Sequence, residues 1–245
     1  GSYDLSLSSN RSAKGFPALD YLLNGLGDTD ADILAFYNGD NKEAYLQYTE
    51  DVLMDMQSLT ETVVSDWTNG YRDTFVANDG ASSTASVDRM VNDYIFYYEK
   101  YLRAGKMGIP LGVFSGSTLP RNVEAYYEAT ISNDLFLEGL SAVQDFFNGN
   151  HFNSSTQGES LASYLDALNT LKNGEDLSTL INDQFNTAKN MVLDLSAFRA
   201  EIENSNPPTS MLLAYDEVQK AVPMLKVDMV SAMSISIDFV DADGD

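Results

Sequence analysis

Apolar side chains recur at steps of three and four residues along most of the chain, a spacing that places them on one face of an α-helix. The first long stripe, between about residues 41 and 69, consists of Tyr45, Tyr48, Val52, Met56, Leu59, Val63 and Trp67. Comparable stripes predict helices over about 84–104, from Pro120 to about 148, over 176–203 and over 210–234. Pro223 is expected to kink the last of these helices. The pattern therefore predicts an all-α protein.

Turn-forming residues separate the predicted helices and divide the chain. Glycine, proline, asparagine and serine gather at 25–40, 78–84, 105–119, 149–159 and 204–208. The connector at 105–119 holds four glycines around an apolar stretch, which is typical of an ordered loop between domains. We therefore expect two helical bundles, formed by residues 1–118 and 119–245.

The charge balance excludes several classes of partner. The 245 residues include 37 acidic and 14 basic side chains, which gives a net charge of -23. Nucleic-acid binding depends on basic residues that neutralise phosphates, so no nucleic-acid partner is expected. Anionic lipid surfaces are disfavoured for the same reason, and no apolar run approaches the about 20 residues that span a bilayer. Any attachment to a membrane would need a lipid anchor upstream of Gly1.

Several catalytic chemistries lack the residues that they need. A catalytic zinc site commonly uses two or three histidines, whereas this sequence has only His151 and no cysteine. His151 lies in a connector and is expected to be solvated. The Gly-x-Ser-x-Gly sequence of serine hydrolases is absent. The acidic segments 28–32 and 241–245 do not complete an EF-hand calcium loop, so they are expected to be solvated loops. A site of carboxylate and tyrosine oxygens that would hold a hard cation stays open.

The segment Lys14-Gly15-Phe16-Pro17-Ala18-Leu19-Asp20 opens a predicted helix and resembles the G-x-H-x-x-E motif of imelysin-like proteins. In that motif His and Glu stand three positions apart, on one helical face from which both could reach one cation. Here Pro17 takes the place of His, and Asp20 takes the place of Glu. Proline has no side-chain ligand atom but suits the first turn of a helix. The resemblance thus implies a retained helix start and a damaged metal site.

Further stretches resemble the same family and extend over most of the chain. They are 106–112 with 120–127, 164–168, 184–185, 215–220, 225–229, 236–239 and 243–245. The resemblance implies a pseudo-symmetric pair of bundles of the four-helix type. Family members usually have several tens of residues before the motif, so the first bundle is expected to lack N-terminal helices. We expect this missing segment of the protein, or a second copy, to cover the stripe that contains Val52, Leu59 and Val63.

A binding site is expected where the motif helix, the 105–119 loop and the helix after Pro120 meet. Its residues would be Lys14, Gly15, Pro17, Asp20, Lys106, Arg121 and Glu124. Asp20 would be the remaining acidic ligand or a hydrogen-bond anchor, while Lys14 and Lys106 would pair with acids or receive an anionic ligand. A structural network that locks the bundles together is the alternative. No residue is assigned a catalytic role, and Asp20 is the only candidate metal ligand.

The family resemblance also implies a location and a role. It implies export, either to the periplasm or as a lipoprotein of the outer membrane or cell surface, and a part in bacterial iron, haem or metal acquisition. The partner would be iron or another divalent cation, haem, or a protein of an uptake system. The damaged motif favours a noncatalytic binding protein. A metallopeptidase, the activity that named the family, and a structural or partner-binding surface lipoprotein are the alternatives.

Overall fold

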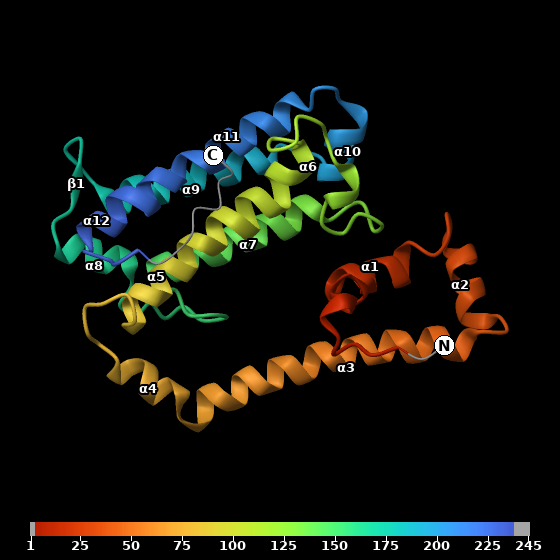
Figure 1. Cartoon of the computed structure of the whole chain (residues 1–245). Coiled ribbons are helices and arrows are strands. Elements are labelled where there is room, and N and C mark those ends of the chain that lie inside the picture. Colours follow the sequence, from red (N-terminus) through yellow and green to blue (C-terminus); the bar gives the residue numbers. More distant parts are fainter. Residues whose placement is uncertain (1–2, 238–245) are drawn as a thin grey trace. The chain divides into compact units, whose positions relative to one another are not determined.

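The computed structural model describes residues 3–237 and confirms the all-α prediction (Figure 1). Its residues group into two compact units. The first unit comprises the residues up to Ala77 together with Glu124–Ala129, and the second comprises Asn78–Val123 together with the residues from Thr130 onward. The boundary between the units along the chain falls after Ala77, because the next helix packs with the later helices. The domain boundary that we expected from the sequence lies after residue 118.

The second unit is a bundle of four long helices. They are α5 (Ser86–Phe96), continued by η3 (Tyr97–Gly108) and α6 (Ile109–Leu111); α7 (Ser132–Asn148); α9 (Leu177–Leu193); and α11 (Thr209–Pro223), continued by η5 (Met224–Met229) and α12 (Val230–Ala232). Both η3 and α9 pack against α7 and α11, which closes the bundle (Figure 1). The short helices η4 (Pro120–Asn122), α8 (Leu161–Ala167) and α10 (Phe198–Asn204) connect the long ones.

Aromatic side chains from three of these helices fill the bundle core. Tyr98, Phe147 and Phe185 are fully buried. The Phe185 ring centroid lies 5.7 Å from that of Tyr98 and 6.0 Å from that of Phe147. The Tyr98 hydroxyl donates a hydrogen bond of 2.7 Å to the carbonyl of Val218, so the polar end of this buried ring has a partner.

A charged network lies inside the bundle where η3 meets α11 and η5. The Glu99 and Arg103 side chains are 3% and 4% exposed, and a Glu99 oxygen lies 3.6 Å from an Arg103 nitrogen. Lys226 approaches the same carboxylate at 3.4 Å. Arg103 also donates to the Tyr215 hydroxyl over 2.6 Å and to the side chain of Gln219. Because a buried charge is costly without partners, these contacts are interdependent.

We predict that Glu99→Gln lowers the free energy of unfolding of the second unit by about 3–5 kcal/mol, because it leaves the Arg103 guanidinium buried without its counter-ion. Glu203→Gln is the matched control, since Glu203 forms the same type of i,i+4 pair with Arg199 but at 38% exposure. Its cost is expected to stay below about 1 kcal/mol. Urea denaturation followed by far-ultraviolet circular dichroism measures both, and equal losses would contradict the prediction.

The first unit is built on one long helix, α3 (Lys42–Asp66). The other elements are η1 (Ser8–Ala13), α1 (Gly15–Asn24), α2 (Asp30–Asn38), η2 (Trp67–Tyr71) and α4 (Arg72–Ala77). α1 and α2 both pack against α3. The core between them is small: Ala18, Leu19 and Val52 are buried, and Leu5, Tyr48 and Met56 pack against them.

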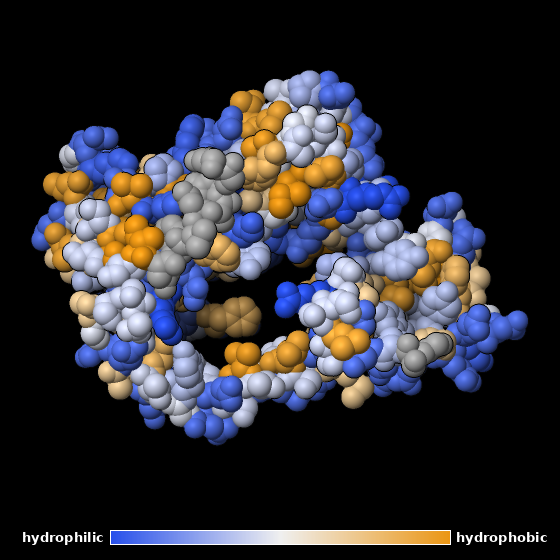
Figure 2. Space-filling model, in the orientation of Figure 1, coloured by the Kyte–Doolittle hydropathy of each residue, from blue (hydrophilic) through white to orange (hydrophobic). Residues whose placement is uncertain are grey.

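The apolar stripe of α3 is buried at one end only. Val52 is fully buried, whereas Leu59, Val63 and Trp67 are 58%, 69% and 42% exposed. Figure 2 shows hydrophobic residues at the surface over this helix. The stripe continues beyond α3, where the rings of Trp67, Tyr71 and Phe75 lie 5.8 to 6.4 Å apart. Coverage of this face by another segment or by a second copy stays a prediction.

Val52 and Val63 allow a matched test of this uneven burial. We predict that Val52→Ala lowers the free energy of unfolding of the first unit by about 2 kcal/mol, through lost transfer energy and a cavity. Val63→Ala on the same helix is expected to change it by less than about 0.5 kcal/mol, because the side chain is already in water. Fluorescence of Trp67, the only tryptophan, reports unfolding of this unit. Equal losses would show that Val63 is buried in solution by another segment or a second copy.

Two expected connectors contain helix. Residues 25–40 were expected to be a loop but include α2, whose N-terminus is fixed by a capping box between Thr29 and Asp32. The acidic residues of that segment thus begin a helix. The connector expected from residue 105 starts only after Leu111, because Leu102, Met107 and Leu111 are buried and the apolar stripe continues past the glycines. Burial therefore outweighs the low helix propensity of glycine here.

The prediction of a long helix that starts at Pro120 is also wrong. Only the short η4 follows Pro120, and α7 begins at Ser132. Between them Ala125 and Ala129 have positive φ angles of 53° and 71°, which a helix does not accommodate. The helix predicted over 176–203 is divided into α9 and α10, and the predicted kink at Pro223 falls where α11 passes into the π-helix η5.

A short hairpin was not predicted. It pairs β1 (Leu171–Lys172) with β2 (Glu175–Asp176) around Asn173 and Gly174, both at positive φ. Asn-Gly is a strong signal for such a turn, so the sequence held the information. The acidic segment 241–245 lies outside the described residues. Within residues 3–237, no helix has both the length and the apolar composition needed to cross a membrane.

Candidate functional site

The motif-like segment forms the start of α1 in the first unit. Lys14 is extended, with φ -142° and ψ 177°, and Gly15 then takes a left-handed φ of 74°, which glycine adopts without steric cost. Pro17 lies in the first turn and is exposed. It cannot donate to a ligand or coordinate one, because its ring closes on its own backbone nitrogen.

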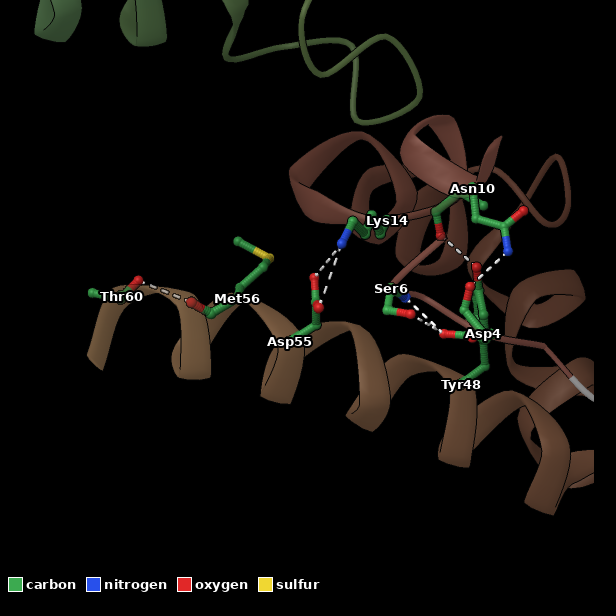
Figure 3. A network of polar contacts seen from close by, with 9 residues as sticks. Asp4, Ser6, Asn10, Lys14, Tyr48, Asp55, Met56 and Thr60 are labelled. Carbon is green, nitrogen blue, oxygen red and sulfur yellow. Dashed lines mark hydrogen bonds and ion pairs between the residues drawn. The ribbon is translucent and has the colours of Figure 1, made fainter. Parts of the chain in front are cut away.

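Lys14 is held by an ion pair with the long helix of the same unit. Its Nζ lies 3.1 Å from Oδ2 of Asp55 on α3, and both side chains are 23% exposed (Figure 3). Nearby, the Tyr48 hydroxyl donates to the carbonyl of Ala13. These contacts fasten the start of α1 onto α3.

The segment before η1 is fastened to α3 as well. The Tyr3 hydroxyl donates to the Asp51 carboxylate, and this hydrogen bond raises the pKa of Tyr3 to about 12 and lowers the pKa of Asp51. Asp4 closes a local turn by accepting from the backbone and hydroxyl of Ser6, and these bonds lower its pKa (Figure 3). Polar contacts rather than a large core thus position this part of the chain.

The Asp20 carboxylate is a hydrogen-bond anchor for a distant segment of the chain. Its Oδ2 accepts from the backbone N–H of Tyr127 over 2.9 Å, and its Oδ1 accepts from that of Glu128 over 2.8 Å. Oδ1 also accepts from the side-chain amide of Asn24 over 3.2 Å. These bonds attach residues 124–129, which are more than 100 positions away in sequence, to α1 within the first unit.

Aromatic packing reinforces this attachment. The Tyr127 ring packs edge-on against Tyr21 of α1, with centroids 5.1 Å apart. At Gly25 a Cβ atom would lie only 2.5 Å from the Tyr127 ring, so a side chain there would displace the ring. Gly25, at the end of α1, thus allows Tyr127 to approach the helix closely.

The anchor leaves Asp20 little capacity to bind a metal. A carboxylate offers about four lone-pair sites. Three hydrogen bonds occupy most of them, and the neighbouring motif position holds proline. Within residues 3–237, no group of three or more histidine, cysteine, aspartate and glutamate side chains is arranged to hold a metal ion. In the described structure the motif region therefore joins segments of the chain.

The other expected site residues are distributed over the two units. Glu124 is exposed and belongs to the first unit, with Lys14, Gly15, Pro17 and Asp20. Lys106 and Arg121 belong to the second unit. There Lys106 lies on η3 near α7, since a Cβ at Gly139 would lie 3.7 Å from its Cε. A common site formed by all seven residues stays a prediction.

Sequence reasoning missed the partners of the motif. Asp55 sits one residue before Met56 of the apolar stripe, yet nothing in the sequence singled it out among many acidic residues. Tyr127 and Glu128 were expected within a helix, where their backbone N–H groups would have bonded to preceding carbonyls. Only the absence of that helix makes these groups available to Asp20.

We predict that Asp20→Ala destabilises the first unit by about 1–3 kcal/mol, because two backbone N–H groups lose charged hydrogen-bond acceptors at a partly buried position. Amide hydrogen exchange gives the direct readout: the Tyr127 and Glu128 amides should be protected in the native protein and exchange much faster in the variant. Asp28→Ala, at an exposed loop position of the same unit, is the control and should leave both amides protected. Unchanged protection in Asp20→Ala would refute the anchor.

Comparison with known proteins identifies the class of protein that this fold and motif define. The sequence model of the imelysin family matches residues 3–222. Because this match extends over most of the chain, the protein belongs to the imelysin family. No curated protein and no solved structure matches it.

Proposed function

We propose that this protein is a noncatalytic binding member of the imelysin family. The observation that carries the proposal is the Asp20 carboxylate, which accepts hydrogen bonds from Tyr127, Glu128 and Asn24 where the family motif has its Glu. Pro17 in place of His offers no ligand, and Asp20 has most of its lone-pair sites occupied. Metal-activated hydrolysis needs protein ligands and an open coordination position, so a metallopeptidase is the weaker candidate.

The proposed role is the acquisition of iron, haem or another metal by a bacterial cell, with export to the periplasm or anchoring as a surface lipoprotein. This part rests on family membership alone. Binding would then use residues other than the motif, and the partner would be the metal, haem or a protein of an uptake system.

A partner-binding surface protein without a small ligand is a second candidate. It is favoured by the exposed apolar face of α3, where Leu59, Val63 and Val64 are more than half exposed. Apolar surface that is contiguous and exposed often marks a protein–protein interface. Binding measurements separate this candidate from the first.

We predict that the purified protein cleaves no unfolded peptide, with or without added Zn²⁺, Fe²⁺ or Mn²⁺. Asp20→Ala should be equally inactive. Pro17→His combined with Asp20→Glu is expected to restore at most weak divalent-metal binding, because two protein ligands make a poor site where three are usual. Calorimetric titration with each metal and a fluorogenic peptide assay provide the measurements. Metal-dependent cleavage that disappears in Asp20→Ala would overturn the noncatalytic assignment.

Haem and Fe³⁺ titrations test the acquisition role separately. Saturable binding that is unchanged in Asp20→Ala would support a site outside the motif. If neither ligand binds, the acquisition role fails and the partner-binding candidate remains, while the noncatalytic assignment is unaffected.

A further inference from the structure

The second unit has an open polar cleft at one end of its bundle. The cleft measures about 750 Å³ and lies between the end of α7, the segment 157–160 with α8, and the first turns of α9. Its lining consists almost wholly of carboxamide, hydroxyl and carboxylate side chains, together with backbone. The volume is within the range of small-molecule sites, but an apolar lining is the rule there. The polar lining therefore needs an explanation.

Hydrogen bonds fix much of this lining in place. The side-chain amides of Asn148 and Asn182 bond to each other in both directions, over 2.8 and 2.9 Å. Gln144 donates a further bond of 2.9 Å to Asn182. One turn earlier on α9, the Ser178 hydroxyl donates to Asp166. A lining held in this way loses little conformational entropy when a ligand binds.

The same bonds leave both acceptors and donors without partners among the described residues. Asp166 and Glu159 each use one carboxylate oxygen, toward Ser178 and Ser163, and each keeps the other. The Gln157 side chain spends one N–H on the carbonyl of Asn148 and keeps its oxygen. The Thr179 hydroxyl lines the cleft without a hydrogen bond to any other described residue, so it can donate one to a ligand. A ligand in the cleft would thus meet acceptors and donors side by side.

The chemistry of the lining narrows the class of ligand. No lysine or arginine lines the cleft, and two carboxylates do, so phosphates, carboxylates and the propionates of haem would be repelled. An apolar ligand would remove water from these polar groups without replacing its hydrogen bonds. A ligand rich in hydroxyl groups can donate to the carboxylates and accept from Thr179 and the amides at once.

An aromatic side chain lies on the loop beside the cleft. The isolated bridge between Asn150 and Gln157 closes this loop, which carries Phe152 at 93% exposure. The His151 ring packs against Gly158 in the wall of the cleft. Such ring faces can pack on the C–H surface of a sugar while the polar lining bonds to its hydroxyls.

We propose that this cleft binds a neutral, hydroxyl-rich ligand of the saccharide class. Asp166, Glu159 and Gln157 accept hydrogen bonds from sugar hydroxyls, Thr179 donates one, and Phe152 packs on the ring. The site is separate from the motif helix and does not rest on the function proposed above.

Nuclear magnetic resonance titration of the isotope-labelled full chain tests the proposal. The probes are maltose, cellobiose, lactose and chitobiose, followed by a neutral glycan array. At least one neutral glycan should cause saturable shifts confined to residues 144–166 and 176–186. Thr179→Val and Gln157→Leu should each weaken binding at least tenfold. Thr187→Val, a matched change at an exposed threonine two turns along α9, should leave it unchanged.

Two outcomes would overturn the proposal. One is the absence of saturable shifts with every neutral glycan while the native fold persists by circular dichroism. The other is binding of spermidine but of no sugar, abolished by Asp166→Asn, which would make the cleft a cation site. Binding of sugars that is equally weakened by Thr187→Val would place the ligand elsewhere and would also refute the assignment of this cleft.

Discussion

Every amphipathic helix in this protein has an apolar face that must leave water, and the two units meet this constraint to different degrees. In the second unit η3, α7, α9 and α11 turn their apolar faces toward one another, so that residues such as Phe136, Leu140 and Phe185 are fully buried. In the first unit α3 packs against α1, α2 and the segment that holds Tyr3 and Leu5, and its apolar face is covered near Val52 but not near Val63.

The scarcity of apolar burial in the first unit raises the importance of its polar contacts. A core built around Ala18, Leu19 and Val52 contributes little hydrophobic stabilisation compared with a full bundle. The contacts of Lys14 with Asp55, Tyr48 with Ala13, and Asp20 with residues 127 and 128 then decide how the segments lie on α3. A ligand that bound to these side chains would have to replace contacts that hold the first unit together.

Helical periodicity predicted the long elements well because it records burial. The stripe over 41–69 became α3 with η2, and the stripe over 84–104 became α5 with η3 and α6, which continue past the expected end to Leu111. Periodicity failed where a few specific contacts determine the backbone conformation. Residues 123–131 have an apolar pattern compatible with a helix, yet Ala125 and Ala129 turn to positive φ while Asp20 takes the amides of residues 127 and 128. Such a long-range bond leaves no trace in local sequence.

The candidate site illustrates the same limit. The sequence revealed that Pro17 and Asp20 replace His and Glu, because that is a matter of residue identity. It could not show what Asp20 does instead, since Tyr127 and Glu128 are more than 100 residues away. It also gave no sign that Asn148, Asp166 and Ser178 would meet in a cleft, because asparagine, aspartate and serine are common wherever helices end.

The replacement of Glu by Asp at position 20 and the anchoring of residues 124–129 are connected by geometry. The aspartate carboxylate stands one methylene closer to α1 than a glutamate carboxylate would, and at that depth it meets the two backbone amides at 2.8 and 2.9 Å. A carboxylate held by these donors is turned toward the attached segment, and position 17, one turn before it, offers no second ligand. One acid cannot both anchor this segment through both oxygens and share a cation with a residue at position 17. The contacts observed for Asp20 in this protein are those of an anchor.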